Sequence, residues 1–208
     1  SLFDKITRIE LDSRQIRINF HNSAASRLFH SGYMAQSPCL TVQNPVGNKK
    51  IKVSYTLTED NELKIHYHAT SDKQTIINMT NHSYFNLAGH DAGEIYGHIL
   101  TLNAAHYTPV VAGAIPTGEI APVQGTPMDF TEPKQIGNEI DAEFEQLKLT
   151  GGYDHNWVLD GEAGTLRHIA TVEEPGSGRV MKVYTDLPGY FKFIYSSCII
   201  FPVWAENC

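Results

Sequence analysis

"IKVSYTLTEDNELKIHYHAT", residues 51–70, alternates apolar and polar side chains on both sides of a polar turn at 59–61. The apolar set is Ile51, Val53, Tyr55 and Leu57 before the turn, and Leu63, Ile65 and Tyr67 after it. In an extended chain, every second side chain points to the same face. The stretch therefore predicts a β-hairpin with one buried face.

The rest of the chain continues this strand-rich pattern. A second hairpin is expected in "LRHIATVEEPGSGRVMKVYTD" (166–186), with its turn at 175–178. Short strands are expected in "TLNAAHYTPV" (101–110), "GEIAPVQG" (118–125) and "HNWVLDG" (155–161), and a short helix in "PKQIGNEIDAEFEQL" (133–147). This succession predicts an all-β sandwich or barrel. We expect one domain over residues 1–208, with atypical sequence at 21–50 and 190–208.

Composition excludes several classes of protein. The formal net charge is −7, and the densest basic group among 16 Lys and Arg residues is Lys49, Lys50 and Lys52, which argues against a nucleic-acid partner. No apolar run reaches the roughly 20 residues that a membrane helix needs. The start, "SLFDKITRIELD", lacks the layout of a secretory signal, so we expect a cytoplasmic protein. The three cysteines, Cys39, Cys198 and Cys208, predict incidental reduced thiols.

Three sequence patterns that can mark a metal site, a phosphate loop or a glycosylation site are weak evidence in this chain. His66 and His68 share a strand face as a metal pair would, but no third ligand at suitable spacing is evident, which favours two solvent-facing histidines. The "GSG" at 176–178 lies in a turn and opens no helix, so it is no phosphate loop. Asn78 and Asn81 begin glycosylation triplets, but both lie inside an apparent strand.

Two polar and aromatic clusters are better candidates for a site. In "NMTNHSYFNLAGH" (78–90), His82 has polar neighbours, and Tyr84 and Phe85 offer flat surfaces on which a sugar ring can pack. In "GGYDHNWVLDG" (151–161), Asp154 and His155 lie between a Gly-Gly turn and Trp157. A carboxylate there could accept hydrogen bonds from hydroxyl groups. The residues alone leave open whether either cluster is functional or part of the core.

The same segments resemble the aldose 1-epimerase (galactose mutarotase) family. The likeness rests on the first cluster, on "YTPVVAGAIPTGEIAPVQGTPMDF" (107–130), on "LTGGYDHNWVLDG" (149–161) and on "SGRVMKVYTDLPG" (177–189). With the first hairpin, it covers about residues 52–189 in the right order. The resemblance implies a large antiparallel β-sandwich of the galactose mutarotase type, here incomplete. It also implies interconversion of the α and β anomers of free hexoses such as galactose or glucose.

The resemblance assigns residues to this chemistry. Ring opening needs a proton given to the ring oxygen and one taken from the anomeric hydroxyl, and a histidine can exchange protons near neutral pH. By resemblance, His82 is the acid and Asp154 binds sugar hydroxyls, while Asn81, Tyr84 and Phe85 are candidates to line the cleft. The resemblance implies no metal or organic cofactor and a monosaccharide as ligand. We expect a monomer or weak homodimer, with no membrane partner.

The chain also departs from the family pattern. Family members carry an arginine and a second histidine, in Leu-His-Gly-Gly, before a stretch similar to "LFDKITRI" (2–9), and a base glutamate in Leu-Glu-Thr-Gln. None of these motifs occurs in the 208 residues, and Glu206 in "WAENC" does not match the glutamate motif. We therefore expect an impaired epimerase. The alternatives are a non-catalytic carbohydrate-binding β-domain and an inactive fragment.

Overall fold

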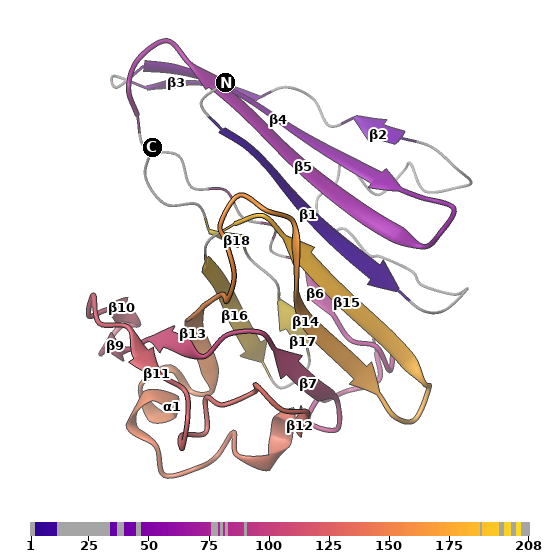
Figure 1. Cartoon of the computed structure of the whole chain (residues 1–208), viewed down its shortest axis with the longest axis vertical. Helices are drawn as coiled ribbons and strands as arrows, with labels where there is room; N and C mark the ends of the chain where they lie inside the picture. The colour runs from indigo at the N-terminus through magenta and orange to yellow at the C-terminus, as the bar shows by residue number, and fades with distance from the viewer. Residues whose placement is uncertain are drawn as a thin grey trace.

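Antiparallel strands are the dominant regular structure of the described residues in the computed structural model, and helices are few and short (Figure 1). The structure describes residues 3–11, 34–36, 40–44, 47–75, 79, 81, 83–89, 91–187, 189–195, 198–200 and 203–204. Side chains are described for residue 9 and for those of these residues that lie between 48 and 187. No helix among them is long and apolar enough to cross a membrane.

The larger sheet contains both predicted hairpins. Its order is β12-β7-β14-β15-β1-β5-β4-β2, with β3 paired to β4. The strands are β1 (Phe3–Leu11), β2 (Met34–Gln36), β3 (Leu40–Asn44), β4 (Gly47–Leu57), β5 (Glu62–Ser71), β7 (Ile99–Leu102), β12 (Lys134–Gln135), β14 (Arg167–Glu174) and β15 (Arg179–Thr185). β4 and β5 form the first hairpin and β14 and β15 the second, and β1 joins the two by pairing with β5 and β15.

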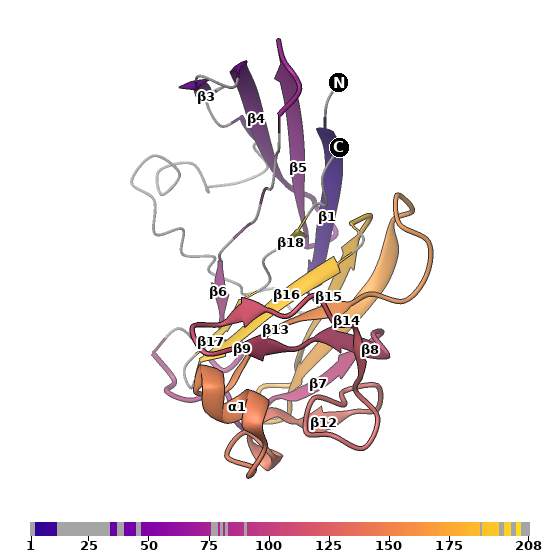
Figure 2. The same cartoon turned by 90° about the vertical axis from the view of Figure 1, so that its left-hand side faces the viewer.

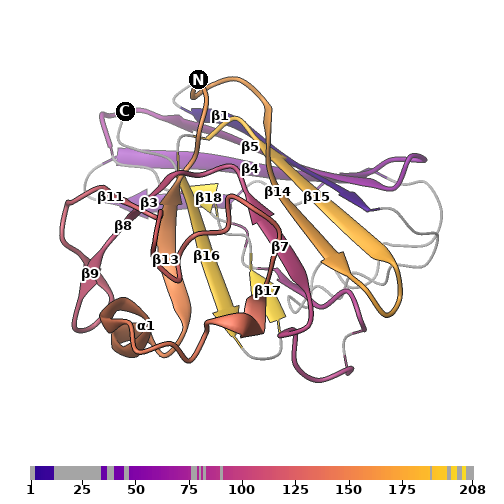
Figure 3. The same cartoon turned by 60° about the horizontal axis from the view of Figure 1, so that its bottom comes forward.

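The smaller sheet brings distant segments together in the order β11-β8-β13-β16-β17-β6, with β18 paired to β16. Its strands are β6 (Tyr84–Phe85), β8 (His106–Thr108), β11 (Ala121–Pro122), β13 (Tyr153–Val158), β16 (Gly189–Tyr195), β17 (Cys198–Ile200) and β18 (Val203–Trp204). A separate pair is formed by β9 (Val110–Val111) and β10 (Ile115–Pro116). Figure 3 shows β13 and β16 of this sheet next to β7 and β14 of the larger sheet, and the two sheets together confirm the predicted sandwich.

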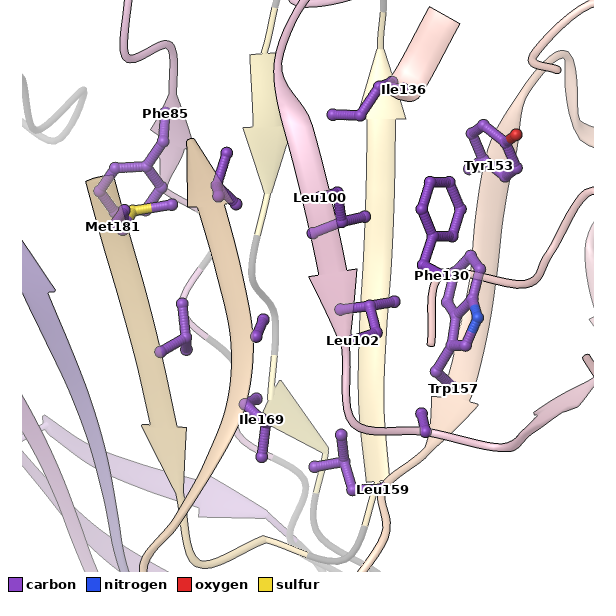
Figure 4. Packing of buried hydrophobic residues seen from close by; sticks show 14 of the residues in the cluster. Phe85, Leu100, Leu102, Phe130, Ile136, Tyr153, Trp157, Leu159, Ile169 and Met181 are labelled. Carbon is purple, nitrogen blue, oxygen red and sulfur yellow. The ribbon is translucent and has the colours of Figure 1, made fainter. Parts of the chain in front are cut away.

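One hydrophobic core lies between the sheets (Figure 4). The larger sheet contributes Leu100, Leu102, Ile169 and Met181, and the smaller sheet contributes Phe85, Tyr153 and Trp157. The indole nitrogen of Trp157 donates to the carbonyl of Met128 at 3.1 Å, so the polar end of this buried side chain has a partner. Burial on one face of each strand explains the period-two pattern of the sequence.

The first hairpin differs in one respect from its prediction. Leu63, Ile65 and Tyr67 on β5 are buried, whereas Ile51, Val53 and Tyr55 on β4 are only partly covered and Leu57 is 38% exposed. β4 lies toward the end of the sheet order, and Figure 2 shows β3, β4 and β5 extending away from the smaller sheet. The apolar face is therefore shared as predicted, but its cover decreases from β5 to β4.

The helix expected over 133–147 is divided in the structure. Residues 134–135 form β12, Ile136–Asn138 form the 3₁₀ helix η1, and the α-helix α1 spans Glu145–Thr150. Gly137 donates its N–H to the carbonyl of Tyr96, and a Cβ at this glycine would lie 2.7 Å from the Cβ of Tyr96. This close tertiary contact holds the middle of the segment in the 3₁₀ turn, and the segment forms no continuous helix. Within the atypical segments the structure describes strand backbone at 34–36, 40–44 and 47–50 and at 190–195, 198–200 and 203–204. The side chains of all three cysteines lie outside the described residues.

Candidate active site

Asp154 lies on β13, on the face that points away from the core. The strand alternates strictly: Tyr153, His155 and Trp157 are buried, while Asp154, Asn156 and Val158 are partly exposed. The predicted site residue and its neighbour His155 therefore point to opposite faces of the smaller sheet. Of the two, Asp154 is the one that a ligand on the outer face can reach.

Tyr84 lies in the same cross-strand row as Asp154. Asp154 pairs with Phe193, Phe193 with Ile200, and Ile200 with Tyr84. Residues paired in this way share a face of the sheet, and three strand spacings separate the ends of the row by about 14 Å. Tyr84 is 57% exposed, whereas the adjacent Phe85 is 8% exposed and belongs to the core. Of the two predicted aromatic platforms, Tyr84 is on the face of Asp154, and Phe85 serves packing.

Asn81 is buried and its side chain is hydrogen-bonded at both ends. Its Nδ2 donates to the hydroxyl of Tyr55 at 3.2 Å, and its Oδ1 accepts from the backbone N–H of Ser83 at 3.1 Å. His82, the predicted acid between these two residues, lies outside the described residues. Its role remains a prediction from the resemblance.

A second set of contacts holds Leu87, which lies farther along the segment 78–90. The N–H of Leu87 donates to Nε2 of His98 at 3.1 Å, and its carbonyl accepts from Nη1 of Arg179 at 2.8 Å and from the hydroxyl of Ser177 at 3.4 Å. Because Nε2 accepts, the ring of His98 is neutral. Burial lowers the pKa of His98, and the nearby Glu174 and a hydrogen bond to the backbone of Ile95 oppose this shift.

His155 has a structural role that the sequence analysis did not assign. Its side chain is 0% exposed, and its Nε2 donates to Oε1 of Gln146 at 3.1 Å. The amide of Gln146 also bridges the backbone N–H and carbonyl of Val110, at 2.7 and 3.1 Å. His155 thus joins β13 to α1 and β9. Its Nδ1 has no hydrogen-bond partner within the described part of the chain.

The burial of His155 predicts that stability depends on pH. Burial lowers the pKa of His155 to about 4, compared with 6.5 for an exposed histidine. Between these pH values the unfolded state binds more protons than the folded state. The contribution of the neutral His155 to the free energy of unfolding is therefore fully present above pH 6.5, and it decreases by about 3 kcal/mol as the pH falls to 4. Urea unfolding at several pH values should show this slope, and it should be shallower in His155→Phe. An equal slope in the unsubstituted protein and in His155→Phe would contradict the prediction.

The histidine pair on β5 lies where the pattern placed it. His66 and His68 alternate with the buried Ile65, Tyr67 and Ala69, so both point away from the core, and both are half-buried. Within the residues whose side chains are described, no group of three His, Cys, Asp or Glu side chains is arranged to hold a metal ion.

Comparison with known proteins agrees with this architecture. A model of the aldose 1-epimerase family matches residues 46–194. Galactose mutarotase of Bos taurus is 45% identical over 143 residues, which are 69% of this chain and 40% of that protein. Aldose 1-epimerase of Escherichia coli K12 is 39% identical over 142 residues, which are 68% of this chain and 40% of that protein. The match thus spans about two fifths of the length of these curated relatives.

Solved structures show the same fold. A galactose 1-epimerase from Lactobacillus acidophilus superposes with a TM-score of 0.67 and 25% identity, over 84% of this chain and 58% of that one. A GalM/aldose epimerase homologue from C. elegans gives a TM-score of 0.68 at 22% identity, over 84% of this chain and 59% of that one. The two sheets are therefore an antiparallel β-sandwich of the galactose mutarotase type. The chain belongs to the aldose 1-epimerase family.

Proposed function

We propose that the outer face of the smaller sheet, between Tyr84 and Asp154, binds a free hexose such as galactose or glucose. The observation that carries the proposal is the shared row of these two residues across β6, β17, β16 and β13. A carboxylate accepts hydrogen bonds from hydroxyl groups, and an exposed aromatic ring packs against the apolar face of a sugar. The names of the relatives, galactose mutarotase and aldose 1-epimerase, favour the same class of ligand.

The proposed reaction is interconversion of α and β anomers by acid–base ring opening. His82 donates a proton to the ring oxygen while a water molecule, in place of the family's glutamate, takes the proton of the anomeric hydroxyl, and the bond between C1 and the ring oxygen breaks to give the open-chain aldehyde. Rotation about the C1–C2 bond followed by the reverse transfers inverts the anomer. The same histidine recovers its proton when the ring closes. Asp154 holds the sugar through its hydroxyl groups, and the chemistry requires no metal or organic cofactor. We place the protein in the cytoplasm as a monomer or weak homodimer.

A non-catalytic carbohydrate-binding domain is the second candidate. The observation that favours it is that the 208 residues contain no Leu-Glu-Thr-Gln, the context in which the family carries its base glutamate. Catalysis needs both an acid and a base around one substrate. Binding alone would need only the face described above. The activity of the 208-residue chain is therefore proposed to be impaired.

Calorimetric titration with galactose tests the binding proposal shared by both candidates. Because the face offers one carboxylate and one exposed aromatic ring, we expect weak, saturable binding in the millimolar range, about −4 kcal/mol. Mannitol, which has hydroxyl groups but no ring, serves as the control and should bind less. Absence of saturable heat with both galactose and glucose would refute the proposal.

A further inference from the structure

Tyr55 contacts the segment that carries the proposed acid. It lies on β4, paired with Ile65 on β5, so the larger sheet sets its position. Its hydroxyl accepts the hydrogen bond from Nδ2 of Asn81 at 3.2 Å. Burial raises the pKa of Tyr55, and the hydrogen bond from Asn81 partly offsets this shift, so the hydroxyl stays neutral. A residue from the first hairpin thereby reaches the motif of the smaller sheet.

This contact fixes which way the amide of Asn81 is turned. With Nδ2 directed at Tyr55, Oδ1 is left to accept from the N–H of Ser83. The two residues on either side of His82 in the chain are thus tied to each other and, through Asn81, to the larger sheet. Without the hydroxyl of Tyr55, the buried Nδ2 would lose this acceptor, and the amide would lose the contact that orients it.

The downstream side of the motif is fixed independently. Phe85 and Leu87 are buried in the core, and the peptide groups of Leu87 are held by His98 and Arg179. Residues 81 and 87 are therefore both anchored. Of the two anchors, the one at Asn81 is next to His82 in the chain.

We propose that Tyr55 is a positioning residue, which acts through the side chain of Asn81 to hold Asn81 and Ser83, the chain neighbours of the proposed acid His82, in place before a sugar binds. The inference rests on the proposed role of His82. Tyr55 itself carries out no proton transfer. Its contribution is preorganisation, because an ordered segment has less conformational entropy to lose when a ligand binds.

Tyr67 provides a matched control for the test. It lies on the adjacent strand β5, opposite Val53, and its side chain is buried. Its hydroxyl has no hydrogen-bond partner within the described residues. Tyr55→Phe and Tyr67→Phe thus delete the same atom from neighbouring strands, and only the first deletion removes the contact to Asn81.

The direct readout is the ring signal of His82 in NMR spectra of histidine-labelled protein, assigned by its absence in His82→Gln. We expect this signal to shift or broaden in Tyr55→Phe and to stay unchanged in Tyr67→Phe. Asn81→Ala should reproduce the change, and adding Tyr55→Phe to it should have no further effect, because both act through one bond. An unchanged signal in Tyr55→Phe, or equal changes in the two tyrosine variants, would overturn the inference. If Tyr55→Phe does not fold, Asn81→Ala decides by the same criterion.

Galactose titration separates this inference from the proposed function. Loss of one hydrogen bond that preorganises the segment should weaken galactose binding about fivefold in Tyr55→Phe, and binding should be unaffected in Tyr67→Phe. If the unsubstituted protein binds no sugar while its His82 signal still responds to Tyr55→Phe, the coupling stands and the proposed function fails. If sugar binds equally well to all three proteins, the positioning role is refuted and the proposed function stands.

Discussion

Freshly dissolved α-galactose is expected to mutarotate in the presence of this 208-residue chain at a rate far below that of an intact epimerase. General acid and general base catalysis each contribute roughly 10²–10⁴-fold. The sequence retains the proposed acid, His82, and one proposed sugar ligand, Asp154, but not the family's glutamate, arginine or second-histidine motifs. The loss of the base alone should lower the rate constant by at least about 10²-fold.

Polarimetry of the chain, of its His82→Ala variant and of buffer alone measures this directly. We expect the three traces to be close, with at most a small acceleration that depends on His82. A strong acceleration that disappears in His82→Ala would show that another carboxylate or a second subunit supplies the base. In that case the site is complete, and our proposal of impairment is wrong.

Substitutions at Asp154 and His155 are expected to affect different properties, although the residues are adjacent: the first galactose binding, the second the stability of the fold. Asp154→Ala should weaken galactose binding by about 10-fold or more, because hydrogen bonds to a charged group contribute roughly 1.5–3 kcal/mol. His155→Ala should lower the free energy of unfolding by about 2–4 kcal/mol, since it leaves a cavity in the core and breaks the bond to Gln146. It should leave galactose binding unchanged in the folded protein.

Thermal unfolding and galactose titration of both variants separate the two effects. His155→Asn, a milder change, replaces His155→Ala if the latter does not fold at the temperature of the titration. A larger loss of galactose affinity at His155 than at Asp154 would mean that the buried face of β13, and not its outer face, determines sugar binding.

Local sequence patterns were sufficient to predict the main strands. The alternation in residues 51–70 and the turn at 175–178 predicted two hairpins, and both form with the expected turns. The same alternation in "YDHNWV" (153–158) indicates that His155 shares the buried face of Tyr153 and Trp157, a signal that the sequence analysis did not use. These features could be predicted because side-chain direction along a strand depends on the local backbone alone.

The predicted helix at 133–147 shows where local patterns fail. Helical propensity favoured one continuous segment, but the packing of Gly137 against Tyr96 produces a short strand, a 3₁₀ turn and a six-residue helix instead. The exposed Leu57 has a similar cause, because cover by the second sheet decreases toward the end of the first. Neither outcome has a local signature, since each depends on residues distant in sequence.

The amino-acid sequence by itself determined the strand-rich class, the two hairpins, the family and the choice of Asp154 and His82 as candidates. Tertiary structure decided which residues meet: Tyr55 with Asn81, His98 and Arg179 with Leu87, and Asp154 in one row with Tyr84. It also separated Phe85 from Tyr84 by placing one in the core and the other on the surface. These partners come from strands far apart in the chain, and their contacts follow from the register in which the sheets pair and pack. That register is set by burial of the shared core, a property of the whole fold that no single segment carries.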